Sequence, residues 1–293
     1  MTLLDVLHVL ILAAVQGLAE LLPVSSSAHV IVAEKLLGLD PTKPETTLLL
    51  VMLHTGTMFA VIVYFRRAWK DSIFSSWAVF VEQAVRLLTA TVLTAAVGVP
   101  LILGIEKAAQ QAGRPKAEIE SLFGDLRLIA AALTAGGVLI LWAGLAERRA
   151  ARNRQIGMRE AAWIGAVQGL CLPFRGFSRS GATISTGLLL GVVKARAEQF
   201  SFALAVILTP AAVGREVWRL IKAQHEAGSP GVTWTALAPG LWPSLLGMVC
   251  AFLAGLLALR WLSRWLEGGR WYLFGVYCLL AAAVVFALHY RGY

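Results

Sequence analysis

Hydrophobic residues fill six long stretches of the chain, and each is long enough to cross a lipid bilayer as a helix. A bilayer core requires about 20 apolar residues per helical span. The predicted spans are residues 48–65, 84–105, 128–145, 200–221, 241–262 and 271–289. This pattern predicts an all-α integral membrane protein with six transmembrane helices.

Two further apolar stretches are interrupted by Ser, Gly and Pro residues. Residues 3–22 stop at a polar break and resume as 28–37, and residues 161–172 stop and resume as 183–193. Halves of this length are too short to span. A broken backbone at membrane depth is tolerated only where protein or a wet cavity surrounds it. We therefore expect two re-entrant helical hairpins.

A short internal repeat precedes both breaks, because Ala-Val-Gln-Gly-Leu occurs at 14–18 and again at 166–170. Each half of the chain has one predicted hairpin followed by three spans. An odd number of crossings leaves the chain on the opposite side of the bilayer, so the second copy is inverted relative to the first. We expect one membrane domain, residues 1–293, built from inverted repeats of about 1–149 and 150–293, with the hairpin tips meeting near the midplane.

The basic residues are distributed unequally between the two predicted sides. The net charge is +9, 58% of residues are hydrophobic and the mean hydropathy is +0.72. The positive-inside rule places the richer side in the cytoplasm. Its members are Arg66, Arg67, Lys70, Arg148, Arg149, Arg152, Arg154, Arg159, Lys194, Arg196, Arg264 and Arg270. The other side carries mainly Lys43, Lys107, Arg114, Lys116 and Arg291. The charge therefore reflects topology and anionic lipid rather than nucleic-acid binding, and both termini are expected outside.

The first break concentrates groups able to act on a phosphate. Gln16 and Glu20 are four residues apart, on one helix face, and Pro23 ends that helix. Ser25, Ser26 and Ser27 stand where the next helix begins, so they can cap its free amides, which together form an anion site. His29 follows one turn later. A carboxylate, a hydroxyl and an imidazole can therefore converge here, although Ser-rich helix starts are often only caps and His29 can be a packed polar residue.

The second break places Arg179 between Ser178 and Ser180, ahead of Gly181 and Thr183. A guanidinium can grip a phosphate with two hydrogen bonds. A charge in the bilayer core costs about 2.5 to 3.5 kcal/mol, so both Arg179 and Glu20 are predicted to be functional. They can also pair with each other across the hairpins. Further intramembrane polar groups are His54 and the pair Arg215-Glu216, which can lie near a helix end.

These two motifs resemble those of the undecaprenyl-diphosphatase family, bacterial membrane enzymes associated with bacitracin resistance. The similarity rests on Gln-Gly-Leu-Ala-Glu and Leu-Pro-Val-Ser-Ser-Ser-Ala-His from 16 to 29, and on Gly-Phe-Ser-Arg-Ser-Gly-Ala-Thr at 176–183. It implies hydrolysis of undecaprenyl diphosphate to the monophosphate and inorganic phosphate, which recycles the lipid carrier for peptidoglycan synthesis. The implied setting is the bacterial plasma membrane, with the pocket open to the periplasm.

The resemblance also implies roles for individual residues. The catalytic residues would be Glu20, Ser26, His29 and Arg179. The substrate-binding residues would be Gln16, Ser25, Ser27, Arg175, Ser178, Ser180, Gly181 and Thr183. Family members are typically activated by a divalent cation, so Mg²⁺ or Ca²⁺ is expected, with Glu20 as its ligand. The implied partners are the polyprenyl diphosphate, the bilayer and, as a further candidate, a second copy of the chain.

Two positions depart from the family pattern. Gln16 stands where many members have a second Glu, and Arg175 replaces a Pro that often precedes the Gly of the second motif. The first change removes a carboxylate, so the cation can instead be carried by the diphosphate and use Glu20 alone. Arg175 adds a charge that can grip a second phosphate or anchor the break at the interface.

The chemistry leaves three routes and a second class of function open. Ser26 can attack with Glu20 or His29 as base, the same groups can activate water, or His29 can itself form a phosphohistidine. Inverted repeats with crossed hairpins are also transporter architecture. Movement of a polyprenyl phosphate or a smaller anion across the membrane is therefore the alternative function.

Overall fold

The computed structural model describes residues 3–39, 44–111, 125–147, 154–226 and 234–292. Within these ranges every regular element is a helix, and the one β-type contact is an isolated bridge between Arg154 and Val192. The helices are α1 (Leu3–Leu21), α2 (Ser26–Leu36), α3 (Pro44–Ser72), α4 (Trp77–Gln111), α6 (Leu126–Glu147), α7 (Met158–Cys171), α8 (Arg179–Leu189), α9 (Lys194–Glu226), α10 (Trp234–Glu267) and α11 (Tyr272–Tyr290).

Six of the described helices are long and apolar enough to cross a membrane, which confirms the predicted all-helical class and the number of spans. The qualifying segments are Thr46–Ser72, Trp77–Gln111, Leu126–Ala146, Lys194–Arg215, Gly240–Glu267 and Tyr272–Tyr290. The helices extend beyond the apolar windows. In α4 the first turns carry Glu82 and Arg86, which form an ion pair four residues apart, and such pairs support a helix outside the apolar stretch.

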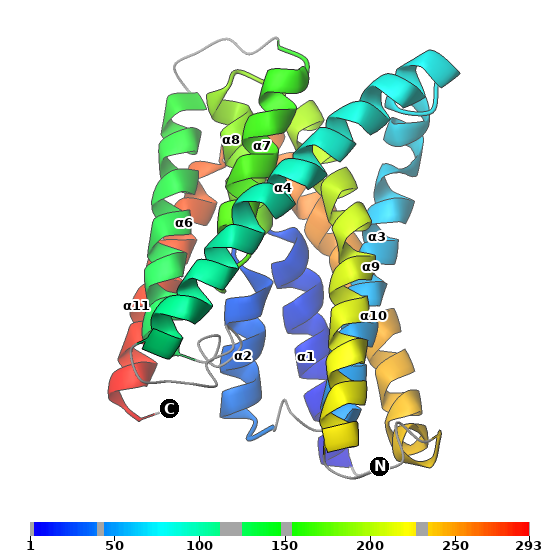
Figure 1. The fold of residues 1–293 in the computed structure, drawn as a ribbon, viewed down its shortest axis with the longest axis vertical. Coiled ribbons are helices and arrows are strands. Elements are labelled where there is room, and N and C mark those ends of the chain that lie inside the picture. The colour runs from blue at the N-terminus through cyan, green and yellow to red at the C-terminus, as the bar shows by residue number, and fades with distance from the viewer. Residues whose placement is uncertain (1–2, 40–43, 112–124, 148–153, 227–233, 293) are drawn as a thin grey trace.

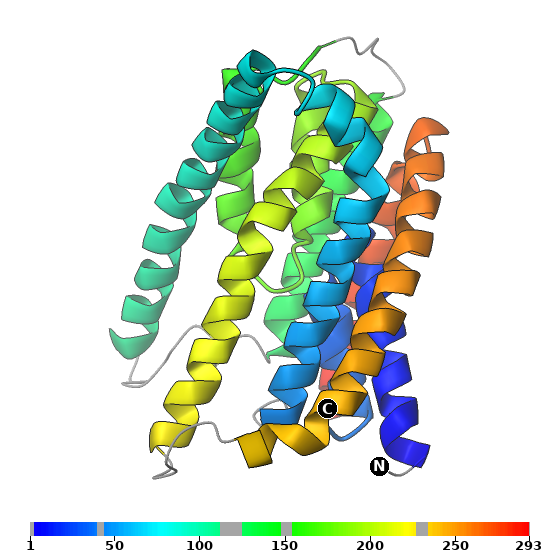
Figure 2. The ribbon, with the colours of Figure 1, turned by 90° about the vertical axis from the view of Figure 1, so that its right-hand side faces the viewer.

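The four short helices form two pairs that approach each other end to end. Figure 1 shows α1 and α2 rising from the end where the termini lie, while α7 and α8 descend from the opposite end. Figure 2 shows the same opposition from the side. The two breaks meet in the interior, where Ser180 Oγ donates to the carbonyl oxygen of Leu22 at 3.3 Å. The second helix of each pair begins at Ser26 and Arg179, earlier than the expected positions 28 and 183.

Each short pair packs against a long helix from the other half of the chain. Helix α1 lies along α10, and α7 lies along α4. Glycines allow both approaches: a Cβ on Gly17 would lie 2.6 Å from Ala254 Cβ, and one on Gly165 would lie 2.3 Å from the Ala90 oxygen. These close backbone contacts hold the two breaks in a packed frame, since any side chain there would force the helices apart.

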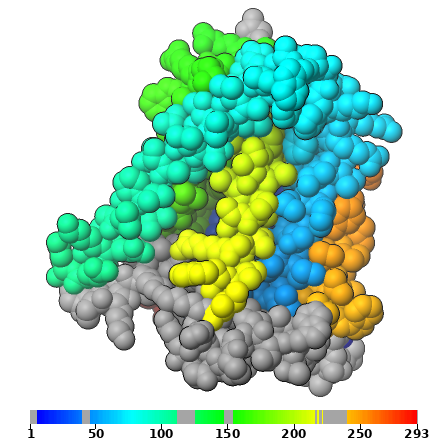
Figure 3. All heavy atoms as spheres, turned by 45° about the vertical axis from the view of Figure 1, so that its right-hand side comes forward, coloured from blue at the N-terminus to red at the C-terminus, as the bar shows by residue number. Residues whose placement is uncertain are grey.

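The outer helices are less tightly joined. Figure 3 shows α4 diverging from α9 along its length, with the surface hollowed between them. An apolar cavity of about 380 Å³ lies among α3, α4 and α9, lined by Trp69, Phe74, Phe80 and neighbouring aliphatic side chains. Such a surface is expected to contact lipid chains in a protein of this class.

Candidate active site

The backbone is strained at the same point of both breaks. Ser25 has φ 69° and ψ 92°, and Ser178 has φ 65° and ψ 92°. These two serines are the non-glycine residues with positive φ in the part of the chain that the structure describes. Such a conformation costs about 1 to 3 kcal/mol and persists where surrounding structure enforces it, often at functional sites. Each serine directly precedes a helix, so Ser26 and Arg179 start α2 and α8 in equivalent positions.

The Glu20 carboxylate lies between these two first residues. Ser26 Oγ donates to Glu20 Oε2 at 2.5 Å, and Arg179 Nη2 donates to Glu20 Oε1 at 3.0 Å. Gln16 Nε2 also donates to Oε2, at 3.1 Å. The side chains of Arg179 and Glu20 are 23% and 16% exposed, so the ion pair is poorly hydrated. The predicted pairing of Glu20 with Arg179, between the two breaks, is confirmed.

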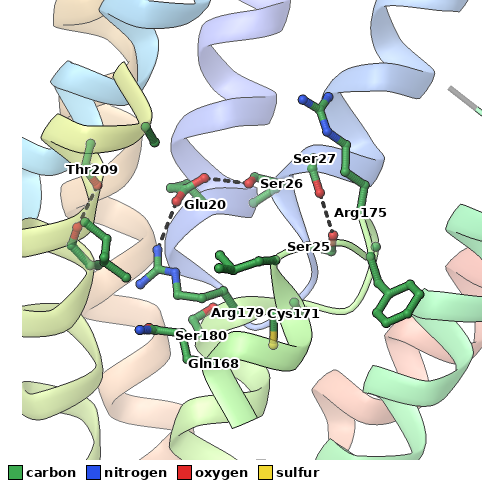
Figure 4. A pocket seen from close by; sticks show the side chains of 18 of the residues that line it. Glu20, Ser25, Ser26, Ser27, Gln168, Cys171, Arg175, Arg179, Ser180 and Thr209 are labelled. Carbon is green, nitrogen blue, oxygen red and sulfur yellow. Dashed lines mark hydrogen bonds and ion pairs between the residues drawn. The ribbon is translucent and has the colours of Figure 1, made fainter. Parts of the chain in front are cut away.

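A cavity of about 270 Å³ opens at this ion pair. Its walls combine the first break, with Glu20 and Ser25 to Ser27, and the second, with Arg175, Ser178, Arg179 and Ser180. Figure 4 shows Glu20 between Ser26 and Arg179, with the hydrogen bonds that join the two breaks. Arg179 Nη1 is buried and has no hydrogen-bond partner among the described residues. Together with the amino ends of α2 and α8, this unused donor makes the cavity suited to an anion.

His29 does not join this group, so the convergence expected for its imidazole is wrong. Its Nδ1 lies 2.8 Å from the Ser25 carbonyl oxygen and its Nε2 lies 2.8 Å from Tyr277 Oη. The ring also stacks on Tyr277, with centroids 5.7 Å apart. Both ring nitrogens are therefore occupied by structural partners. The helical turn between Ser26 and His29 directs the ring towards α11 instead of the cavity.

His54 of α3 occupies the place expected for that imidazole. It lines the cavity, and its Nε2 lies 3.9 Å from Glu20 Oε2. Its Nδ1 lies 2.8 Å from the Leu50 carbonyl oxygen. Since a carbonyl only accepts, Nδ1 carries a proton, and Nε2 is the ring nitrogen nearer to Glu20. The sequence signalled His54 as an intramembrane polar group, but it lies within a continuous span, away from both breaks.

The remaining predicted binding residues separate into two groups. Ser25, Ser27, Arg175, Ser178 and Ser180 line the cavity. Gln16, Gly181 and Thr183 are not among the lining residues.

The second group supports the first through hydrogen bonds. Gln16 binds Glu20, and the Gly181 amide donates to Ser178 Oγ at 3.2 Å, which caps α8. Thr183 is fully buried, with its hydroxyl 2.6 Å from Ser201 Oγ. Their roles are therefore to position the strained turn and Glu20.

The lining residues outside the predicted set include, besides His54, the side chains of Gln168, Cys171 and Thr209. Gln168 is the middle letter of the second Ala-Val-Gln-Gly-Leu copy, so the repeat itself was the signal for it. Arg215 lies exposed on α9, away from the cavity lining. The Glu216 side chain is outside the described residues.

A divalent cation would find few protein ligands here. Within the described ranges no three His, Cys, Asp or Glu side chains cluster closely enough to hold a metal. Glu20 is the acidic residue of the cavity lining, and both of its oxygens already accept hydrogen bonds. Mg²⁺ commonly binds through one or two carboxylates and substrate phosphates. The donor set fits only an ion that arrives with a phosphate ligand.

The fold and the site together define a class of protein. It is a multi-pass helical membrane protein with a Ser–Glu–Arg centre at a cavity suited to an anion. The family model described as "Bacitracin resistance protein BacA" matches residues 9–284 of this chain. The chain belongs to this family.

Its relatives carry a consistent name. The chain is 57% identical to "Undecaprenyl-diphosphatase 2" of Acinetobacter baylyi over 97% of its own length and 98% of the relative's. It is 34% identical to "Undecaprenyl-diphosphatase 1" of Burkholderia pseudomallei, with 92% of each chain covered. It is 31% identical to the "Undecaprenyl-diphosphatase" of Christiangramia forsetii over 97% and 98% of the two chains.

Proposed function

We propose that this protein hydrolyses undecaprenyl diphosphate to undecaprenyl phosphate and inorganic phosphate. The full-length relatives bear the name of this activity. The structural observation that carries the proposal is the Ser26–Glu20–Arg179 centre at a polar cavity. A hydroxyl hydrogen-bonded to a carboxylate is the arrangement of an activated nucleophile, and a guanidinium with a free Nη is a phosphate ligand.

In the first step Ser26 Oγ attacks the terminal phosphorus. Glu20 accepts the hydroxyl proton, because its Oε2 already receives that hydrogen bond. The new Oγ–P bond forms as the anhydride P–O bond breaks, and undecaprenyl phosphate leaves with the bonding pair. The leaving phosphate carries away the proton held by Glu20, so Glu20 is a carboxylate again before the second step. Arg179 and the amino ends of α2 and α8 stabilise the negative charge on the phosphoryl oxygens. Arg175, also at the cavity, adds positive charge beside the leaving phosphate.

In the second step water attacks the phosphoserine and releases inorganic phosphate. The water oxygen bonds to phosphorus, the P–Oγ bond breaks and Ser26 regains a proton through Glu20. Ser26 is favoured over His29 because both His29 nitrogens are engaged by Ser25 and Tyr277. His54 is the imidazole placed to support Glu20.

A divalent cation, Mg²⁺ or Ca²⁺, is proposed to bind together with the substrate. Glu20 would be its protein carboxylate, and the diphosphate oxygens would supply the other anionic ligands. The ion would neutralise phosphate charge and favour the leaving group.

The whole chain is proposed to form one membrane domain of two inverted repeats with re-entrant hairpins. The matching strain at Ser25 and Ser178 and the crossed packing of α1 on α10 and α7 on α4 support this arrangement. The Lys/Arg distribution favours a cavity open to the periplasm. Some of the basic residues counted for this orientation lie outside the described residues, namely Lys43, Arg114, Lys116 and those in the segment 148–153. In this setting the enzyme would recycle the carrier for cell-wall synthesis and contribute to bacitracin resistance; a homodimer stays a prediction.

The decisive assay uses purified protein in detergent with undecaprenyl diphosphate. Inorganic phosphate should be released, and Glu20→Gln protein should release almost none. Because detergent leaves no second compartment, turnover there excludes a pure transporter, the alternative that the relatives' names do not favour. Absence of phosphate release by folded wild-type protein would contradict the proposed function.

A further inference from the structure

Gln168 is a buried carboxamide at the cavity to which the mechanism has assigned no task. Its side chain is 0% exposed, and it lines the cavity with Arg179 and Ser180 (Figure 4). Its Oε1 atom is buried and accepts no hydrogen bond from any described residue. Leaving a buried acceptor unpaired is unfavourable, so its presence at the cavity indicates that a bound molecule supplies the donor.

The hydrogen bonds around Thr94 determine which end of the carboxamide faces that molecule. Gln168 Nε2 lies 2.9 Å from Thr94 Oγ1. The single hydroxyl proton of Thr94 is directed at the carbonyl oxygens of Ala90 and Gly165, at 2.8 and 3.0 Å. Thr94 can therefore only accept from Gln168, which makes the amide nitrogen its partner. The acceptor, Oε1, is therefore the end of the carboxamide that has no partner among the described residues.

The close contact of α4 with α7 makes this orientation rigid. Gly165 and Gly169 of α7 contact the α4 backbone, and a Cβ on Gly169 would lie 2.8 Å from the backbone carbonyl oxygen of Thr94. Thr94 is 2% exposed, so it holds the amide without water competing. Gln168 is thus presented to the cavity from a packed helix interface and not from a loop.

The chemistry of the site identifies the missing donor. Ionised diphosphate oxygens only accept hydrogen bonds, and a prenyl tail has no donor, so neither part of the ionised substrate satisfies Oε1 before hydrolysis. Water donates. We infer that Gln168 Oε1 accepts a hydrogen bond from the water that hydrolyses phosphorylated Ser26 and so positions its oxygen for attack. This inference rests on the proposed function. Glutamine positions the attacking water in other phosphoryl-transfer sites.

The step balances with the groups already described. The water oxygen forms the new bond to phosphorus while the P–Oγ bond of phosphoserine breaks. One water proton passes to the Glu20 carboxylate and then to Ser26 Oγ, and the other stays on the released phosphate. Gln168 exchanges no proton, so its effect is on position.

The test separates the two steps by rapid acid quench with substrate labelled at the terminal phosphate. In Gln168→Leu, label transfer to protein should proceed at nearly the wild-type rate, while release of inorganic phosphate falls about a hundredfold, the scale of a misplaced reactant. Labelled protein should therefore accumulate towards one equivalent per enzyme. Gln168→Glu, which keeps an acceptor, should recover part of the release rate.

Two α4 variants accompany this measurement. Thr94→Val, which removes the hydroxyl that orients the amide without entering the cavity, should produce the same split in milder form even if Gln168→Leu fails to fold. Thr91 lies one turn earlier on α4, outside the lining of this cavity, and its hydroxyl donates to the Leu87 carbonyl oxygen. Thr91→Val should behave as wild type. Equal slowing of both steps, or no accumulation of labelled protein, in folded Gln168 variants of an active enzyme overturns the inference alone. A wild-type protein without phosphate release overturns the proposed function as well.

Discussion

Ser26 and Arg179 occupy equivalent positions in two different helices and bind opposite oxygens of one carboxylate. Each is the first residue of its helix and follows a serine with positive φ. Ser26 Oγ binds Glu20 Oε2 and Arg179 Nη2 binds Oε1, at 2.5 and 3.0 Å. Glu20 therefore connects the proposed nucleophile of one break to the phosphate ligand of the other. Substitution of Ser26, Glu20 or Arg179 should therefore alter the hydrogen bonds of the other two side chains.

Glu20→Gln should reduce turnover by about 10²- to 10⁴-fold, the usual contribution of a general base. The amide cannot take the Ser26 proton, and the Arg179 charge loses its partner. The measurement is phosphate release from undecaprenyl diphosphate at saturating substrate. Gln16→Glu serves as the comparison, because Gln16 only donates to Glu20 from outside the cavity lining, and it should stay active. A Glu20→Gln enzyme with most of its rate would move the base to His54.

Arg179→Lys should also lose most activity although the charge is kept. The guanidinium uses Nη2 for Glu20 while Nη1 stays available for a phosphate oxygen. An ammonium on a flexible stem cannot place two donors at these sites. Steady-state kinetics should show a fall in kcat that is larger than any rise in KM. Near-normal kcat in the Lys variant would show that one point charge is sufficient.

His54→Ala should impair turnover more than His29→Ala does. His54 lines the cavity at 3.9 Å from Glu20 Oε2, whereas His29 is held by Ser25 and Tyr277 outside it. A loss of about tenfold or more is expected for His54→Ala. His29→Ala should act chiefly through stability, which thermal unfolding in detergent would report. If His29→Ala lowered kcat more than His54→Ala did, in variants of equal stability, His29 would be the catalytic histidine.

The proposed topology predicts that Arg291→Cys reacts with a membrane-impermeant thiol reagent added to intact cells, while Lys70→Cys does not. The two positions lie at opposite ends of the helices, with Arg291 just after α11 and Lys70 near the end of α3. The unmodified protein provides the background from Cys171, Cys250 and Cys278. Labelling at 70 without labelling at 291 would invert the orientation.

The sequence predicted the helical class, six spans and the contact of Glu20 with Arg179. The length of each apolar stretch can be read directly from the sequence, and a charge within the membrane is costly unless it has a partner. It did not predict the direction of His29. A shift of one residue in the start of a helix rotates its side chains by about 100°, which decides whether a side chain faces a cavity or a neighbouring helix. His54 and Gln168 were harder still. His54 lies within a continuous apolar span and Gln168 lies in the last turn of α7, and only the packing of α3 and α7 around the breaks brings them to the cavity.

The most direct test of the central claim is to identify the atom that carries phosphate during turnover. Protein quenched in neutral denaturing detergent, which preserves both phosphoserine and phosphohistidine, after brief exposure to terminally labelled undecaprenyl diphosphate would be digested and the labelled peptide mapped. The expected result is phosphoserine at Ser26, no label in Ser26→Ala and undiminished label in Ser27→Ala. Label on a histidine, or full turnover by Ser26→Ala, would contradict it.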